Sequence, residues 1–130
     1  MFTRKTLLTI IASGAVVGGA MQLLHAAETK GSSYVVGMIN VKDEESYKTK
    51  FLPDAQKVIK DHGGVYLAGG FNKAVALTGA APPNRVVIFK FEGVDGAKKW
   101  WEGGGKKIND EVGVKYADFH VLAVEGIEAQ

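Results

Sequence analysis

His62 and Arg85 are the residues whose types could carry chemistry near neutral pH. His62 stands directly before Gly63 at the end of a helical pattern, and an imidazole beside a cleft can act as a general base because its ordinary pKa is close to neutral. Arg85 begins an apolar run, and its planar guanidinium could hold a carboxylate or a phosphate. Each residue also has a structural alternative. His62 could interact with the negative end of its helix, and Arg85 could pair with Asp118 or Glu125 of a neighbouring strand.

Four aromatic side chains are candidates for binding a ligand. Tyr47, Tyr66, Trp100 and Trp101 could line a pocket between helices and a sheet, where aromatic walls favour planar organic molecules. The alternative is that these side chains only fill the hydrophobic core.

Several classes of site are not expected. The sequence contains no cysteine, so it has no disulfide, no thiolate metal site and no cysteine nucleophile. His62 and His120 have no acidic residue at a recognisable ligand spacing, so we expect no metal site and no cofactor. His120 alternates with Leu122 and Val124, which favours a place at a dimer seam over a role as a ligand.

The first 26 residues have the pattern of a secretory signal peptide. A basic start precedes an uncharged apolar stretch over residues 6–24, and small residues permit cleavage after Ala26. An uncleaved membrane anchor is the alternative, but Gly, Ala, Ser and Thr dilute the stretch below a typical spanning helix. We therefore expect a periplasmic or secreted protein with no stable membrane anchor after cleavage, in which residues 27–130 form a single domain.

The basic excess of the chain belongs to this first segment. The 16 basic residues become 14 when Arg4 and Lys5 are removed, which equals the 14 acidic residues. A domain with balanced charge lacks the basic surface that attracts phosphates, so a nucleic-acid partner is not expected.

The apolar patterns predict the order β-α-β-β-α-β, which is typical of a ferredoxin-like α+β fold with both helices on one face of an antiparallel sheet. The predicted strands are residues 34–41, 65–68, 85–91 and 117–124, and the predicted helices are residues 43–62 and 95–102, with 106–112 adding a turn or two. Pro53 should kink or restart the first helix, and Gly63 should end it.

Two glycine runs interrupt these patterns. Gly69-Gly70 is interpreted as a β-bulge or sharp bend in one long strand that resumes at residues 74–77, because no helix follows it as a phosphate-cradling loop would require. Gly103-Gly104-Gly105 is interpreted as a flexible break that ends or loosens the second helix, with an anion site on its backbone N–H groups as the alternative.

Both faces of the predicted sheet are apolar. In the first strand Val35, Ile39 and Val41 alternate with Val36 and Met38, and the third and fourth strands show the same pattern. An antiparallel sheet with one face in water should carry polar residues there. The uncovered face would exceed the apolar patch that soluble monomers usually tolerate, so we expect a homodimer built as an α+β barrel, with sheet packed on sheet.

The residues between Tyr34 and Gly126 resemble the family of the domain of unknown function 1330. The resemblance rests on Tyr34, His62-Gly63-Gly64, Leu67-Ala68-Gly69-Gly70, Leu77-Thr78-Gly79, Pro83-Asn84-Arg85-Val86-Val87, Phe91, Ala97, Trp100 and Val124-Glu125-Gly126. It implies a dimeric α+β barrel of ferredoxin-like subunits and no established activity. In the second helix the family pattern has a Trp-Tyr pair followed by Ser-Pro-x-Tyr, whereas this chain has Trp100-Trp101 followed by Glu102 and three glycines, so no role of that Ser or Tyr carries over.

Three functions are consistent with the sequence. The leading hypothesis is an exported small-molecule-binding domain with a pocket between sheet and helices. The first alternative is a cofactor-independent isomerase or monooxygenase acting on a planar organic substrate, which rests on fold analogy. The second alternative is a structural homodimer without a ligand, so the sequence leaves open whether the protein is an enzyme.

Overall fold

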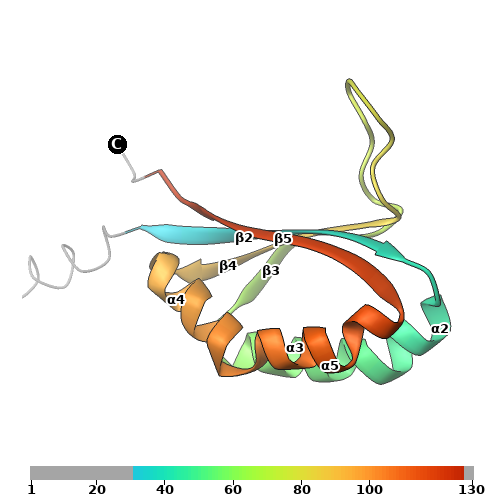
Figure 1. The fold of residues 1–130 in the computed structure, drawn as a ribbon. Coiled ribbons are helices and arrows are strands. Elements are labelled where there is room, and N and C mark those ends of the chain that lie inside the picture. The colour runs from blue at the N-terminus through green and yellow to red at the C-terminus, as the bar shows by residue number, and fades with distance from the viewer. Residues whose placement is uncertain (1–30, 128–130) are drawn as a thin grey trace, which may run out of the picture. The chain divides into compact units, whose positions relative to one another are not determined.

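The computed structural model describes residues 31–127, and the predicted signal peptide over residues 1–26 lies outside that range. The four strands are β2 (Ser32–Val41), β3 (Val65–Phe71), β4 (Arg85–Glu92) and β5 (Ala117–Glu125). They form one antiparallel sheet in the order β3-β4-β2-β5. The helices are α2 (Glu44–Ser46), α3 (Leu52–Asp61), α4 (Gly93–Trp100) and α5 (Lys106–Glu111). All of them lie on one face of the sheet (Figure 1), so the predicted ferredoxin-like α+β fold is confirmed.

The hydrophobic core lies between the sheet and the helices. Along β2 and β4 every second side chain is buried on the helix side, as the period of a strand requires. Val35, Val87 and Phe91 belong to this buried set, and Trp100 of α4 packs on Phe91 with 5.4 Å between ring centroids. The alternation that the sequence predicts therefore places one apolar face of the sheet in the core.

The first helical segment begins and restarts where the sequence predicts. The Asp43 carboxylate accepts a hydrogen bond from the Ser46 backbone N–H at 3.1 Å, which caps α2. A wide, π-type turn over Tyr47–Phe51 follows, and Pro53 then occupies the first turn of α3, where its missing N–H costs no hydrogen bond. Gly63 ends the segment with a φ of +80°.

The predicted path of the second strand is wrong beyond Gly70. Strand β3 runs through Gly69 and Gly70, which pair with Val87 and Val86, and it ends at Phe71. Its register irregularity lies between Tyr66 and Ala68 and not at the glycine pair. Residues 74–77 form no strand. If the register of Phe71 with Arg85 continued, residues 79–82 would lie opposite them, and Pro82 has no N–H to donate to a sheet.

Residues 72–84 instead form a projecting loop, here called the arm. In Figure 1 the arm rises from the sheet on the side opposite the helices. Its base is closed by a hydrogen bond from the Asn72 N–H to the Asn84 carbonyl at 2.8 Å. The Asn84 side chain both donates to and accepts from the Val41 backbone, each at 2.8 Å, and so fixes the arm to β2. Sequence reasoning assigned no role to Asn84.

The glycine run after α4 interrupts the helix with a kink at Gly104. The wide turn Trp101–Gly105 connects α4 to α5, and only Gly104 departs from helical backbone angles. Val58 of α3 approaches Gly104 closely, at a distance that leaves little room for a side chain on Gly104. The predicted break thus lies at Gly104, where the two helical segments meet and Val58 packs against the glycine run.

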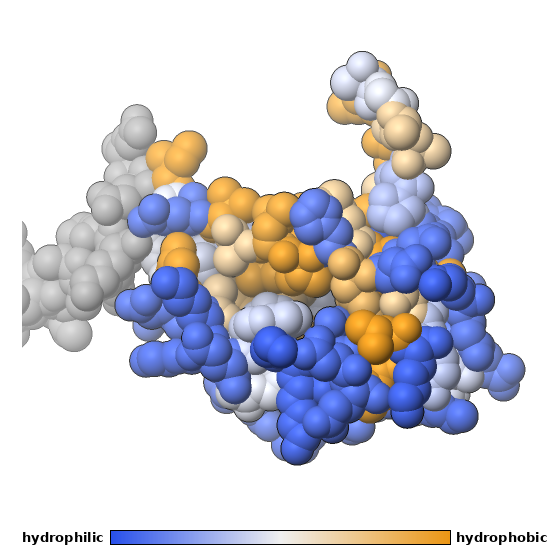
Figure 2. Space-filling model, in the orientation of Figure 1, coloured by the Kyte–Doolittle hydropathy of each residue, from blue (hydrophilic) through white to orange (hydrophobic). Residues whose placement is uncertain are grey.

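The middle of the sheet face opposite the helices is apolar in the described residues, with polar residues such as Lys90, Asp118 and His120 around it. Val36, Met38, Val86 and Ile88 point to this side, because they alternate with the buried residues of β2 and β4. Figure 2 shows hydrophobic residues gathered over the sheet and hydrophilic residues over the helices. We call this surface the outer face. Among residues 31–127 no helix has the length and apolar character needed to cross a membrane.

Candidate functional site

A cavity of about 50 Å³ lies between the helices and the inner side of the sheet. Its lining comes from β2, β3, β4 and β5, from both wide turns, and from α3, α4 and α5. All four predicted ligand-binding residues contribute to it, namely Tyr47, Tyr66, Trp100 and Trp101, and so does Arg85. The fold therefore brings together five residues that are up to 54 positions apart in the chain, from Tyr47 to Trp101.

Aromatic rings form two walls of the cavity. Phe89 contacts Tyr66 and Trp100, with ring centroids 5.4 and 5.2 Å apart, and Trp100 contacts Trp101 at 5.4 Å. A second group joins Tyr47 to Phe51 at 5.0 Å, and Phe51 to Phe119 at 5.3 Å. Rings in tilted and edge-to-face contact provide large apolar surfaces with defined orientation. The walls suit the apolar body of an organic molecule.

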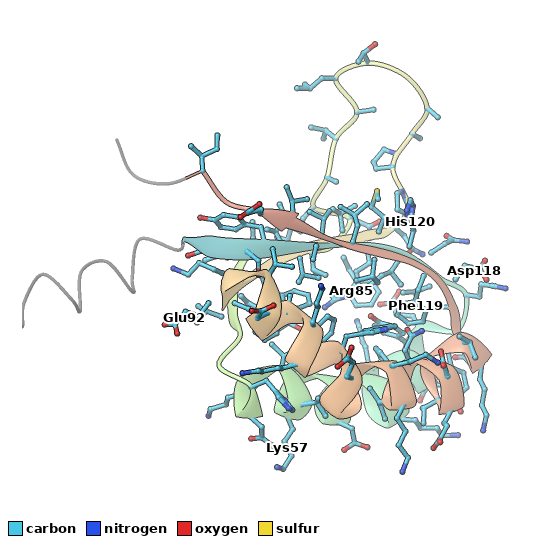
Figure 3. The ribbon with its side chains drawn as sticks, turned by 60° about the vertical axis from the view of Figure 1, so that its left-hand side comes forward. Lys57, Arg85, Glu92, Asp118, Phe119 and His120 are labelled. Atoms are coloured by element: carbon cyan, nitrogen blue, oxygen red, sulfur yellow. The ribbon has the colours of Figure 1, made fainter. Side chains whose placement is uncertain are left out.

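Arg85 lies inside the molecule without a carboxylate partner. Only 7% of it is exposed, and its side chain projects between the sheet and the helices (Figure 3). Among the described residues no carboxylate comes within ion-pair distance of it, and its Nε has no hydrogen-bond partner. The guanidinium instead lies over the Phe71 ring, 4.8 Å from the centroid, and 5.7 Å from that of Tyr47.

The predicted pairing of Arg85 with Asp118 or Glu125 is wrong. Asp118 is exposed and pairs with Lys42 at 3.1 Å. Arg85 stands beside Ile39, which in turn stands beside Phe119, so these three side chains share the inner face while Asp118 projects to the other side. Glu125 aligns with Ser33, six residues from Ile39, which places it about 20 Å away along the strand.

Tyr47 is the most deeply buried polar side chain of the cavity, with 1% exposed. Burial raises its pKa to about 12, because a phenolate would lose its hydration there, and the positive charge of Arg85 opposes part of this shift. At neutral pH the hydroxyl is therefore protonated. It can donate a hydrogen bond to a ligand but cannot serve as a base.

The raised pKa of Tyr47 predicts a loss of stability in alkaline solution. The unfolded phenol ionises near pH 10 and the folded one near pH 12, so the native state holds one more proton between these values. Folding stability then falls as pH rises through this window, by up to about 3 kcal/mol, and this contribution is fully present below pH 10. Chemical unfolding at pH 9 and pH 11.5 measures it. We expect a smaller alkaline loss in Tyr47→Phe, and an equal loss in both proteins would contradict the assignment.

A larger groove of about 220 Å³ adjoins the cavity between α4 and β5. The two spaces share Trp100, Trp101 and Val121 in their linings, so these side chains stand between them. The groove also includes Lys98 and Glu102. Figure 2 shows a recess on this side of the molecule, between the apolar sheet and the hydrophilic helices.

The structure does not bring either described histidine to the cavity. His62 Nδ1 lies 2.9 Å from the Val58 carbonyl oxygen of its own helix. Its Nε2 packs so closely against Gly103 that a Cβ added to Gly103 would lie 2.5 Å from this nitrogen. His62 thus has the contact with the helix end that its structural alternative predicted. His120 is exposed on the outer face (Figure 3), and no three His, Asp or Glu side chains of residues 31–127 gather as a metal site requires.

Sequence reasoning missed two further polar or aromatic contributors. Asn109 of α5 contributes to the lining of the cavity, and Phe71 provides the ring beneath the Arg85 guanidinium. Phe71 could have been found only if β3 had been extended to its true end. No pattern in the sequence distinguishes Asn109 from the other polar residues of its helix.

Comparisons with known proteins support the fold. A family model described as a domain of unknown function, DUF1330, matches residues 32–127. The crystal structure of RPA0582, a protein of unknown function from Rhodopseudomonas palustris, has a TM-score of 0.58 and 12% sequence identity, covering 85% of this chain and 94% of that one. The methylated form of RPA0582 has a TM-score of 0.59 and 12% identity, covering 85% and 91%.

A third solved structure is more distant. An EthD-like protein from Ralstonia eutropha JMP134 has a TM-score of 0.49 and 14% identity, covering 77% of this chain and 96% of that one. No curated protein matches the chain by sequence.

Proposed function

The chain belongs to the DUF1330 family, and from this premise we propose that it is an exported protein that binds a small organic molecule between its helices and its sheet. The observation that carries this proposal is the cavity beneath Trp100 and Trp101, with aromatic walls and a buried guanidinium. Apolar walls with a few polar groups that fix orientation are typical of small-molecule sites.

Binding is favoured over catalysis by the groups that line the cavity. Its ionisable residues are Tyr47, Tyr66 and Arg85, and no His, Asp or Glu of the described chain is among them. The phenol of Tyr47 has a pKa of about 12, so it stays protonated at neutral pH. A cofactor-independent isomerase needs a base within reach of its substrate, and His62 faces its own helix end. The enzymatic alternative is therefore the weaker proposal.

Export rests on the sequence of residues 1–26. Their basic start and uncharged apolar stretch match a signal peptide, and cleavage after Ala26 would release the domain to the periplasm or the exterior. The described domain begins at Gly31, five residues after this site, so cleavage there removes no residue of the sheet.

The outer face supports a homodimer, in which the partner is a second copy of this chain. The face presents Val36, Met38 and Ile88 together with Leu122 of β5, and the arm rises beside it with Val75 81% and Leu77 95% exposed. A second copy would cover a self-complementary apolar sheet, and its own sheet would receive this arm. Sheet-on-sheet packing of this kind commonly buries about 800 Å² from each partner, enough for a stable complex.

Native mass spectrometry of protein purified from an exporting host tests these proposals together. We expect a dimer of chains that comprise residues 27–130 and carry additional small-molecule mass. The variant Ala55→Leu inserts a larger side chain into the cavity and should lose that mass, because Ala55 lines it. Gln56→Leu adds the same side chain on the solvent side of α3 and should keep it.

The proposals of cleavage, of a dimer and of ligand binding can each be contradicted separately. A mass that includes residues 1–26 would contradict cleavage after Ala26. A single-chain mass at micromolar concentration would contradict the dimer. Wild-type protein without added mass, or an unchanged adduct on Ala55→Leu, would contradict binding in this cavity.

A further inference from the structure

We propose that the ligand of this cavity is a small organic monocarboxylate whose carboxylate oxygen accepts a hydrogen bond from Arg85 Nε; this inference rests on the proposed ligand-binding function and adds the chemical class of the ligand. It follows from the state of Arg85, from the charge balance of the cavity and from the character of its walls.

The first argument is the buried Nε of Arg85, which has no hydrogen-bond partner. Arg85 is 93% buried, it lines the cavity, and its Nε–H has no acceptor among the described residues. A buried charge without a counter-ion and a buried N–H without an acceptor are both unfavourable, and native proteins seldom keep them without a reason. A carboxylate in the cavity would satisfy both requirements at once, because the planar fork of an arginine matches a carboxylate.

The second argument is the charge of the surroundings. Arg85 is the only residue of the cavity lining with a formal charge at neutral pH. Lys48 also lies over the Phe71 ring, at 4.7 Å, but it is paired with Glu44 at 2.6 Å. The cavity thus offers one uncompensated positive charge, which a monoanion neutralises. A phosphate dianion would leave one negative charge buried among aromatic rings, so the balance favours a carboxylate.

The third argument concerns the remainder of the ligand. Around Arg85 the lining is mostly aromatic and aliphatic, and Tyr47, Tyr66 and Asn109 are its other polar residues. The protonated Tyr47 can donate to a carboxylate oxygen. The cavity of about 50 Å³ accommodates the acid group and a few further atoms. Short aliphatic acids fit this description best.

Matched pairs of acids and amides test the inference. Acetate, propionate and benzoate are compared with acetamide, propionamide and benzamide by isothermal titration calorimetry on the wild-type protein. Members of a pair have nearly the same shape and differ in charge. We expect the best carboxylate to bind about 10- to 100-fold more tightly than its amide, which is the range for a hydrogen bond to a charged group.

Variants of Arg85 provide a second readout. Arg85→Met should abolish the preference for acid over amide and should raise the melting temperature of the ligand-free protein, because it removes a buried, unpaired charge. Arg85→Lys keeps the charge without the fork and should retain only part of the preference. Lys42→Met removes an exposed cation that is paired with Asp118 and should leave carboxylate binding unchanged. If Arg85→Met fails to fold, the comparison of acids with amides on the wild-type protein decides alone.

The outcomes separate this inference from the proposed function. An amide that binds as tightly as its acid would overturn the carboxylate assignment while leaving the cavity as a binding site. If none of the acids binds but the purified protein carries an adduct that Ala55→Leu loses, the carboxylate assignment is also overturned and the binding function stands. Absence of both acid binding and adduct would overturn both.

Discussion

Replacing Ile88 by aspartate is expected to convert the proposed dimer to a monomer. Ile88 lies near the centre of the outer face, where it stands beside Val36 of β2 and Ala68 of β3. In a sheet-on-sheet dimer each copy would bury one unpaired carboxylate among apolar side chains. The cost of several kcal/mol corresponds to a dissociation constant raised by about 1000-fold or more. Sedimentation equilibrium over a range of concentrations measures the change.

A matched control separates this effect from an effect of charge alone. Gln56→Asp adds the same charge on the exposed side of α3, on the helix side of the molecule, and should leave the dimer intact. Leu77→Asp tests the arm, because Leu77 is 95% exposed and therefore packs little against its own subunit. A wild-type monomer at micromolar concentration, or a dimeric Ile88→Asp protein that retains its fold, would refute the sheet-on-sheet arrangement.

Replacing Gly69 by alanine is expected to lower the free energy of unfolding by more than about 3 kcal/mol. Gly69 has a φ of +102°, which strains any residue with a Cβ. A Cβ at this position would also overlap the Val86 carbonyl oxygen and lie 2.8 Å from Val87 Cα. These are backbone atoms of the neighbouring strand, which cannot move without separating β3 from β4. Denaturant unfolding followed by tryptophan fluorescence measures the loss.

Gly79→Ala is the control for the backbone conformation alone. Gly79 has a φ of +83°, but a Cβ there would meet nothing within 4 Å. The expected loss is only about 1 to 2 kcal/mol, the usual cost of a left-handed conformation for a residue with a side chain. Equal losses in both variants would show that the contact with Val86 is unimportant. The glycine pair at residues 69–70 thus has a structural role in the close approach of two strands.

The candidate site was predictable in its residue types and not in its contacts. Tyr47, Tyr66, Trp100 and Trp101 were identified because aromatic side chains at helix and strand positions facing a core can form a pocket, and the structure places all four at one cavity. Arg85 was identified by its charge beside an apolar run. Its lack of an ion pair was not predictable, because a shift of one residue along β5 separates the inner Phe119 from the outer Asp118.

The sequence by itself determined the order of elements, both apolar faces of the sheet and the restart of the helix at Pro53. These features follow from local rules, since strand alternation, helical spacing and the missing N–H of proline act within a few residues. Only the tertiary structure decided that β3 ends at Phe71, that residues 72–84 project as an arm, and that Arg85 is buried beside a cavity. Those outcomes depend on which residues of distant strands and helices meet, and the register that sets these contacts is a property of the assembled sheet.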